Sequence, residues 1–242
     1  MFPSRSAILS GNVFENNYSL LLDGTNEVIA LSSPAAIDNI WSGGGTISCR
    51  LYPTGLSGAS NSRIFDKSKT ILYLQTLSGS TLKIGFFVDF DSTDGSWISD
   101  AIITTNQWNH FVITYNDGHV DNNPIIYIDG VQYTVGSGIT ETTPVGSVVS
   151  DAGDNGFWGN NGDGNRGYLG NMDELAVYSR ILTPTEVAVL YNQGTPSDAR
   201  EIESLTGYWR LEEGSGTNAS DSSTNSNAGT LTNMEAADWV AY

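Results

Sequence analysis

Alternating apolar side chains mark a long strand in the middle of the chain. Within 106–115, both alternating sets of positions are rich in aromatic and β-branched residues, which is typical of a strand that packs on both faces. A second β-branched run covers 125–128, and Asp129-Gly130 then supplies a tight turn into a third strand at 131–135. Two long strands joined over a polar loop and followed by a hairpin indicate an antiparallel β sandwich.

Shorter runs of the same kind lie on both sides of this stretch, and Gly, Pro, Asn, Asp or Ser residues separate them. Many short strands with closely spaced turns predict an all-β fold, an antiparallel two-sheet jelly-roll sandwich. We expect strands at 18–24, 27–31, 46–52, 63–66, 71–76, 82–90, 97–103 and 169–178, with 27–31 returning beside 18–24, and one helical turn within 34–40.

One segment in the C-terminal half carries the signals of a short helix, at 184–193. Thr183 is the expected N-cap, Pro184 the first helical residue, and Glu186 the partner that completes a capping box. Gly194 is expected to end the helix. The apolar positions of this segment fall on one stripe, so the helix should lie against the sandwich.

The charge balance limits the partners of the protein. Its 242 residues include 10 Lys and Arg against 27 Asp and Glu, a formal net charge of −17. This excess of carboxylates argues against nucleic acid and against anionic membrane surfaces, since both bind through cationic side chains. The opening residues lack the apolar stretch of a signal peptide, and no run approaches the length of a membrane span. We therefore expect a soluble chain, without membrane insertion, that the general secretion route does not export. Its single cysteine, Cys49, cannot form an intramolecular disulfide.

Six stretches, in order along the chain, carry a family resemblance. They read Leu-Leu-Asp-Gly at 21–24, Thr-Ile-Ser at 46–48, Gln-Trp-Asn-His-Phe-Val-Ile-Thr-Tyr at 107–115, Ile-Tyr-Ile-Asp-Gly-Val at 126–131, Gly-Asn-Met-Asp-Glu-Leu-Ala-Val-Tyr-Ser-Arg-Ile-Leu-Thr at 170–183, and Glu-Val with Leu-Tyr at 186–191. Together they resemble the laminin G-like, concanavalin A-type lectin and glucanase family of jelly rolls. The stretches 208–211 and 223–234 are also similar in sequence to laminin G-like proteins of tailed phages.

The resemblance divides the chain into three parts: an N-terminal extension at 1–17, a laminin G-like jelly roll at 18–196, and a C-terminal segment at 197–242. The last segment resembles the opening strands of the family, which ordinarily precede the strand at 18–22. It completes its own sandwich as a circular permutation, or a neighbouring subunit's as a swapped strand, or it is the stub of a second domain. In the first arrangement, we expect 208–211 to pair beside 18–22.

The family includes glucanases, and their catalytic strand needs two carboxyls about 5 Å apart on one face. Asn171 and Leu175 stand where the two glutamates would be. Asp173 and Glu174 are neighbours, so an ordinary strand would point them to opposite faces. The only histidines, His110 and His119, supply a metal site or triad poorly. We therefore expect no enzymatic activity and no catalytic residues.

Calcium is the expected cofactor, in a structural role. The resemblance implies a cation where an early strand meets the late strand, which points to Asp23 and Asp173. The alternative is that Asp23 makes a turn and Asp173 bonds backbone amides. A second source of oxygen ligands is the segment 150–168, which Gly, Asn and Asp dominate and which we expect to be one long loop. Its candidate ligands are Asp151, Asp154, Asn155, Asn161 and Asp163.

The same loop suggests glycan binding, because aromatic side chains in a Gly-rich loop are often exposed. A sugar-binding site would combine an aromatic face with Asp and Asn side chains. The alternative is that each aromatic ring caps the core. Trp108, Tyr115 and Trp209 are assigned to the core. The glycan-site candidates are Trp97, which follows the polar turn at 91–96, and, in or beside the loop, Asp154, Phe157, Trp158, Asp163 and Tyr168.

These observations indicate a non-catalytic binding or adhesion module displayed on a surface. The resemblance to phage proteins suggests a virion component, either a capsid decoration or part of a tail fibre, with glycans or other shell proteins as partners. A homo-oligomer would fit that setting. Two alternatives are a purely structural protein that stabilises a shell without binding sugar, and a secreted, extracellular carbohydrate-binding module.

Overall fold

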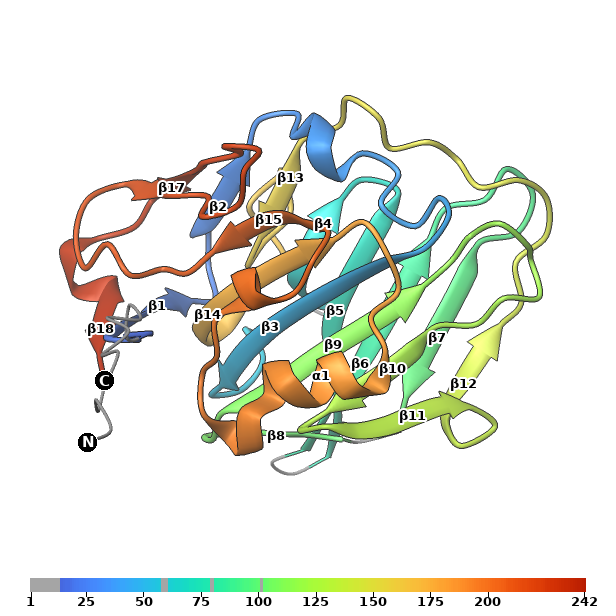
Figure 1. Ribbon diagram of the computed structural model, residues 1–242, viewed down its shortest axis with the longest axis horizontal. Coiled ribbons are helices and arrows are strands. Elements are labelled where there is room, and N and C mark those ends of the chain that lie inside the picture. The colour runs from blue at the N-terminus through green and yellow to red at the C-terminus, as the bar shows by residue number, and fades with distance from the viewer. Residues whose placement is uncertain (1–13, 58–60, 79–80, 101) are drawn as a thin grey trace, which may run out of the picture.

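Two stacked sheets form the molecule, and one short helix lies on the outer face of one of them (Figure 1). The computed structural model describes residues 14–57, 61–78, 81–100 and 102–242. Within these ranges the strand pairings are antiparallel, apart from one short parallel contact between β11 (Val131–Val135) and β12 (Gly138–Thr142). The predicted all-β jelly roll with one short helix is confirmed.

Sheet A contains, in spatial order, β11 (Val131–Val135), β10 (Ile125–Ile128), β9 (Asn109–Tyr115), β3 (Gly45–Pro53), β14 (Leu169–Tyr178), β1 (Tyr18–Asp23) and β18 (Trp239–Ala241), with β15 (Leu205–Trp209) beside the second half of β14. Sheet B contains β12 (Gly138–Thr142), β7 (Gly95–Ser99), β6 (Thr81–Val88), β5 (Thr70–Ser78), β4 (Ser62–Lys67), β13 (Gly156–Trp158), β2 (Val28–Leu31), β17 (Gly229–Thr232) and β16 (Asn218–Ala219), with β8 (Ile103–Thr104) beside β6. Four 3-10 turns complete the described chain: Ala35–Ile37, Asn192–Gly194, Ala199–Glu201 and Ala236–Asp238.

Apolar side chains form two clusters, one on each face of sheet A. The larger cluster lies between the sheets and includes the fully buried rings of Trp97, Trp158 and Trp209. The smaller cluster lies between the outer face of sheet A and helix α1 (Pro184–Tyr191), which contributes Val187 and Leu190. The strands of sheet A are therefore buried on both faces over much of their length, as the middle stretch of the sequence predicts.

Helix α1 begins where the sequence predicts. Thr183 accepts a hydrogen bond from the backbone of Glu186, and the Glu186 carboxylate accepts one from the backbone of Thr183, so the capping box is confirmed. The end differs slightly from the prediction. Asn192 adopts the left-handed conformation with φ of 43° and ends the α-helix, and a 3-10 turn then leads to Gly194.

Strand β2 does not return beside β1, so that prediction is wrong. Strand β1 pairs with β14 and β18 in sheet A, whereas β2 pairs with β13 and β17 in sheet B. The tight turn at Gly24, with φ of +82°, therefore carries the chain from one sheet to the other. A turn signal between two strands identifies a change of direction, but it does not identify the sheet that the second strand joins.

The C-terminal segment pairs with strands of its own chain. β15 pairs with β14, β17 with β2, and β18 with β1 (Figure 1). The prediction that 208–211 pairs beside 18–22 is wrong, because β18 holds that position. β1 and β15 instead follow one another along the same edge of β14, β1 at 169–172 and β15 at 175–178.

The two strands that share this edge are joined through one carboxylate. Glu212, which follows β15, accepts hydrogen bonds from the backbone amides of Asn17 and Tyr18 at 2.8 and 3.0 Å. Of the expected extension at 1–17, residues 14–17 are described and the rest lies outside the described residues. Segments from both ends of the sequence therefore meet at the outer edge of sheet A.

Candidate functional site

Buried polar side chains fix one end of segment 150–168 against the sandwich. The Asp151 carboxylate accepts a hydrogen bond of 2.6 Å from the backbone of Asn39. Lys67 Nζ donates to the Asp151 backbone oxygen at 2.6 Å and to Asp38 at 2.6 Å. Because Lys67 and Asp151 are both buried and paired, Asp151 is not available to a bound cation.

The middle of the segment is fixed by Asn160, whose side chain is fully buried. Its amide nitrogen donates to the backbone oxygens of Thr25 and Glu27 at 3.0 and 3.1 Å. Its amide oxygen accepts from the backbone of Asn161 and Arg166. Both polar ends of this amide are satisfied inside the protein, so Asn160 holds the segment in one conformation.

The segment is not one continuous loop, contrary to the prediction, because β13 lies within it. Gly156–Trp158 pairs with β2 on one side and with β4 on the other, placing Phe157 opposite Ala30 and Asp66. Neighbouring residues of a strand point to opposite faces. Trp158 therefore enters the core, and Phe157 lies half-buried on the outer face of sheet B.

An open cleft of about 340 Å³ lies over the ring of Phe157. Gly162 lies close to this ring, since a Cβ atom on Gly162 would be 3.1 Å from Phe157 Cζ. A side chain at 162 would crowd the aromatic ring. The lining residues come from the end of β4 and from the two turns around β13: Asp66, Ser68, Asp154, Asn155, Phe157, Asn161, Gly162 and Asp163. We call this site the loop cleft.

The carboxylates of the loop cleft differ in their surroundings. Asp66 is buried and forms an ion pair of 2.8 Å with Arg63. Asp154 is half-buried and Asp163 is exposed. Asn155 and Asn161 are already hydrogen-bonded, to Ser33 and to Asn165. The loop cleft therefore combines an aromatic ring with two solvent-facing carboxylates as hydrogen-bond acceptors.

Three of the six glycan-site candidates lie together in an open cleft, and the other three are buried in the core. Asp154, Phe157 and Asp163 meet in the loop cleft. Trp97, Trp158 and Tyr168 are completely buried, so assigning them to a glycan site is wrong. Trp97 also donates its indole N–H to Asn123 at 2.7 Å. The polar turns beside these residues suggested exposure, but strand alternation and core packing determine where the rings point. Asp66 and Ser68 line the loop cleft and were missed, since they are distant in sequence.

The expected calcium pair does not form. Strand pairing places Asp23 beside Leu169 and Leu20 beside Met172, so Asp23 and Asp173 lie roughly 13 Å apart along the strands. Asp23 accepts bonds from the backbone and hydroxyl of Thr25, and the side-chain bond contributes most to lowering its pKa. Across the described ranges, no group of three or more His, Cys, Asp or Glu side chains could hold a metal ion.

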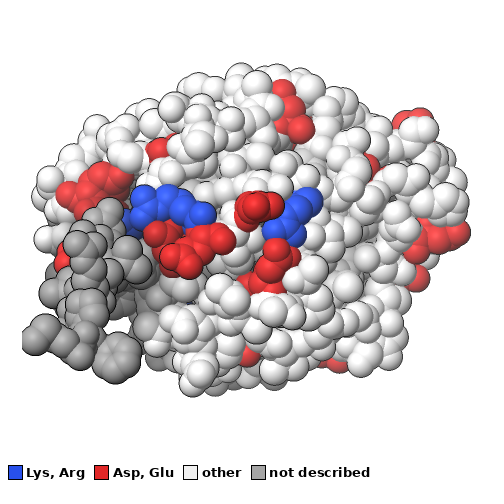
Figure 2. Space-filling model, viewed as in Figure 1, with Lys and Arg blue, Asp and Glu red and all other residues white. Residues whose placement is uncertain are grey.

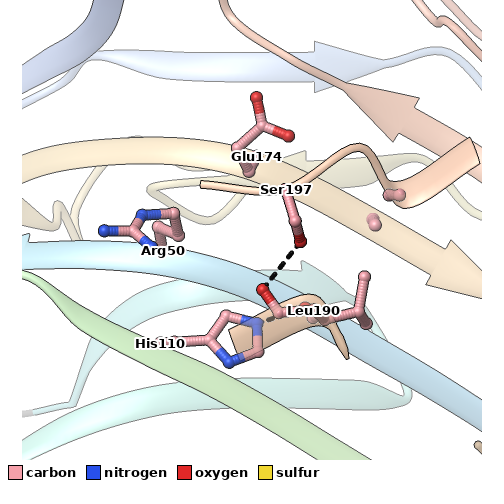
Figure 3. Close-up of a pocket in the computed structure, with 8 residues that line it drawn as sticks. Arg50, His110, Glu174, Leu190 and Ser197 are labelled. Carbon is pink, nitrogen blue, oxygen red and sulfur yellow. Dashed lines mark hydrogen bonds between the residues drawn. The ribbon is translucent and has the colours of Figure 1, made fainter. Parts of the chain in front are cut away.

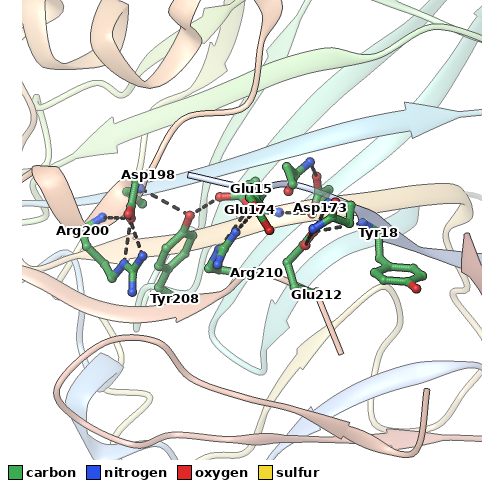
Figure 4. Close-up of polar contacts among 12 residues, drawn as sticks. Glu15, Tyr18, Asp173, Glu174, Asp198, Arg200, Tyr208, Arg210 and Glu212 are labelled. Atoms are coloured by element: carbon green, nitrogen blue, oxygen red, sulfur yellow. Dashed lines mark hydrogen bonds and ion pairs between the residues drawn. The ribbon is translucent and has the colours of Figure 1, made fainter. Parts of the chain in front are cut away.

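Asp173 and Glu174 lie at a β-bulge in β14, where the register shifts and Glu174 has φ of 51°. Asp173 accepts hydrogen bonds of 2.8 Å from Asn16 and from Tyr242. Glu174 accepts from the hydroxyl of Tyr208 (Figure 4). The bulge places both side chains on the outer face of sheet A, so the prediction that they point to opposite faces is wrong.

Both carboxyls are almost completely buried, and burial raises the pKa of each above its usual range. The charge of Asp173 raises the pKa of Glu174 further. Arg210 Nε forms a long ion pair of 3.8 Å with Glu174 Oε1, and its charge opposes the increase in pKa without cancelling it. Their partners are side chains of the same chain, from Asn16 to Tyr242, so the pair joins the terminal segments to sheet A.

A small cavity next to Glu174 is lined by Arg50, His110 and Ser197, beneath helix α1 (Figure 3). Ser197 donates to the backbone oxygen of Leu190 at 2.9 Å. Burial lowers the pKa of His110 to about 3, so the imidazole is neutral. The cavity measures about 10 Å³, which is space for a single water molecule. It is therefore too small to bind a sugar.

Tyr115 and Trp209 are buried in the core, as predicted. Trp108 is not part of the core, because this residue is only half-buried.

On the face shown in Figure 2, Lys and Arg side chains lie next to Asp and Glu side chains, and they form no continuous basic surface. None of the helices in the described ranges is long and apolar enough to cross a membrane.

Comparisons with solved structures show the same fold. A candidate carbohydrate-binding protein of Bacteroides ovatus is 17% identical, with a TM-score of 0.61 over 95% of this chain and 60% of that chain. This chain thus spans about three fifths of that protein's length. The heptameric SAP-like pentraxin of Limulus polyphemus is 19% identical, with a TM-score of 0.55 over 74% of this chain and 83% of that chain.

A tailspike protein of a bacteriophage of Escherichia coli O157:H7 is 15% identical, covering 84% of this chain and 31% of that chain. Its TM-score of 0.47 is too low to support an inference about this chain. None of the curated proteins matches the sequence. A family model described as the concanavalin A-like lectin/glucanases superfamily matches residues 23–188, more than half of the chain. The chain belongs to the concanavalin A-like lectin/glucanases superfamily.

Proposed function

We propose that the protein is a non-catalytic carbohydrate-binding module and that the loop cleft is its glycan site. One observation carries the proposal: the ring of Phe157 lies in an open cleft together with the carboxylates of Asp154 and Asp163. A sugar ring has an apolar face and a rim of hydroxyl groups. The Phe157 ring would contact the face, and the carboxylates would accept hydrogen bonds from the hydroxyls.

The scaffold around the loop cleft suits a binding role. Asn160 and the Lys67–Asp151 pair hold the surrounding turns against sheet B, and a preformed site loses less entropy on binding. The fold neighbour from Bacteroides ovatus is a candidate carbohydrate-binding protein, which supports the proposal by analogy.

The buried carboxyls support a module without catalysis. Asp173 and Glu174 are adjacent in one strand and bonded to Tyr242 and Tyr208, and the cavity beside Glu174 is too small for a sugar. Retaining hydrolysis needs two carboxyls that face each other across the scissile bond.

We propose that the module is displayed on a virion surface or in another extracellular setting, with glycans or shell proteins as partners.

The test is a glycan array followed by titration of the sugars that bind. We expect Phe157→Ala to weaken binding at this site about tenfold, because an aromatic contact is lost. Asp163→Asn should also weaken it, because a neutral amide accepts a weaker hydrogen bond than a carboxylate. Asp121→Asn, which changes an exposed carboxylate outside the cleft, is the matched control.

The array is repeated with calcium and with chelator. Binding by direct contact should persist in chelator, and a loss of binding there would show that a cation bridges the glycan and the carboxylates. If no glycan depends on Phe157 or Asp163 under either condition, the proposal is wrong. A purely structural role in a shell would then be the better account.

A further inference from the structure

A second cleft lies on the outer face of sheet A, at the end of the sheet where β18 pairs with β1. It measures about 190 Å³, and its lining residues come from four strands and the turn before β9: Ser19, Tyr52, Trp108, Asn171, Val240, Ala241 and Tyr242. Their strand neighbours Leu20, Leu51 and Met172 point into the core. The side chains of Ser19, Tyr52 and Asn171 therefore point away from the sandwich. We call this site the aromatic cleft.

Three aromatic rings form the walls of this cleft. The centroids of Tyr52 and Trp108 lie 5.7 Å apart at an interplanar angle of 64°. Those of Trp108 and Tyr242 lie 5.6 Å apart at 37°. Tyr52 and Trp108 are half-buried, and Tyr242 is 57% exposed. Tyr242 is thus the most exposed of the three aromatic residues in the cleft.

Hydrogen bonds hold the walls in place. The Tyr242 hydroxyl donates to Asp173 at 2.8 Å, so a buried carboxyl orients the exposed ring. Asn171 donates its amide N–H to the hydroxyl of Ser19 at 3.0 Å. The amide oxygen of Asn171 is an acceptor that a ligand hydroxyl can use. The cleft therefore pairs oriented aromatic rings with neutral polar groups.

The charges around the cleft narrow the class of ligand. The guanidinium of Arg50 lies over the Trp108 ring, 5.6 Å from its centroid. A cationic ligand is therefore disfavoured, because a protein cation already lies against this ring. Arg50 also donates to the backbone oxygen of Gly194 at 2.7 Å and is buried, so it does not reach out to an anion.

We propose that the aromatic cleft binds a neutral sugar ring, which stacks on Tyr242 and Trp108 and hydrogen-bonds to Asn171. This second site lies on sheet A, whereas the loop cleft lies on sheet B, so the proposal is independent of the first. The module would then bind carbohydrate on both of its sheets and could link two glycan chains.

The test uses two substitutions of Tyr242 that differ only in the ring. Tyr242→Phe keeps the ring and loses the bond to Asp173, whereas Tyr242→Ala loses both. Each is made in the Phe157→Ala background and screened on an array of neutral oligosaccharides. We expect Tyr242→Ala to weaken binding of at least one sugar about tenfold and Tyr242→Phe to stay within about threefold of its parent.

Trp108→Phe serves as a second variant, and it should weaken binding of the same sugar. Melting temperatures of all variants show whether the fold is retained. The proposal is overturned if no neutral sugar distinguishes Tyr242→Ala from Tyr242→Phe in folded protein. It is also overturned if the sugar that distinguishes them is bound equally well by Trp108→Phe. Failure of the loop cleft would appear separately, as unchanged binding in Phe157→Ala alone.

Discussion

Glu174 shows how the backbone conformation of one residue can place a carboxyl group on a face of the sheet that the sequence pattern does not predict. Its φ of 51° lies in the left-handed region, which a glutamate seldom adopts. This conformation creates the bulge that turns Glu174 to the same face as Asp173. Two adjacent carboxyls are then buried together, and burial raises the pKa of both. The protonated form is therefore favoured in the folded protein.

This pair should make the free energy of unfolding fall as pH rises. A carboxyl with a raised pKa in the folded state keeps its full stability below the pKa of the unfolded chain, about 4, and loses stability at higher pH. We expect the melting temperature to decrease as the pH rises above about 4, until both carboxyls are ionised in the folded protein. Glu174→Gln should flatten this decrease, because the amide does not ionise.

Glu203→Gln, at an exposed glutamate, is the matched control and should leave the slope unchanged. Melting curves measured across the pH range give the slope of melting temperature against pH for the parent protein and the two variants. If Glu174→Gln has the same slope as the parent protein, then the buried pair does not control the pH dependence.

At the scale of elements, the sequence predicts local structure well and pairing less well. The capping box at Thr183 and Glu186 is confirmed because its signals lie within one turn of chain. The expected strands at 18–24 and 27–31 also form, but the sheet that β2 joins depends on partners far away in sequence. β13 was missed because Gly156 and its neighbours have loop-like composition, and only pairing with β2 and β4 makes them a strand.

For the candidate site too, the sequence predicts which neighbouring residues lie together, but it does not predict which distant residues strand pairing adds. Asp154, Phe157 and Asp163 are close in sequence, and the structure keeps them together. Asp66 joins them through the pairing of β4 with β13, which no local pattern reveals. Asp23 and Asp173 were matched by family resemblance, but strand register keeps them apart.

The cap of helix α1 gives a prediction at this scale. Thr183→Ala should lower the free energy of unfolding by about 1 kcal/mol, because a backbone N–H of the first turn loses its acceptor. Thr185→Ala, two positions further on in the same helix, is the control and should cause no such loss. Urea titrations measure both. Equal effects of the two substitutions would contradict the role of the cap.

Lys67, the buried lysine that fixes the segment around β13, gives a second prediction at this scale. Lys67→Met should lower the free energy of unfolding by about 3 kcal/mol, because the Asp151 carboxylate would remain buried without its cation. Lys69→Met removes a more exposed pair with Asp89 and should cost less than about 1 kcal/mol. Urea titration compares the two. Similar losses would show that burial does not set the strength of the Lys67 pair.

At the scale of the whole molecule, the C-terminal segment is part of the sandwich. β15, β17 and β18 pair with β14, β2 and β1, and the ring of Trp209 lies 5.9 Å from that of Trp158 in the core. Removing the segment would leave unpaired edges on both sheets, and open edges promote aggregation.

Deletion of 205–242 should therefore unfold or aggregate the protein. Adding the segment back as a separate chain should restore a soluble fold if its strands fill the same positions. Light scattering and circular dichroism of the truncated and recombined proteins measure this. A truncated protein that stays soluble, monomeric and equally stable would show that the segment is dispensable. An intact protein that runs as an oligomer, and that the deletion converts to monomers, would indicate strand exchange between subunits.

The position of these strands in the chain also determines when the sandwich can close during synthesis. A ribosome adds about 5–20 residues per second, and domains generally begin to fold as they emerge. Here β1 and β2 are made before all the other described strands, but their partners β18 and β17 follow more than 190 residues later. The nascent chain therefore carries both open edges while the strands between them are made. We therefore expect closure of the sandwich to follow the synthesis of β17 and β18, and the net charge of −17 opposes aggregation of the open edges until then.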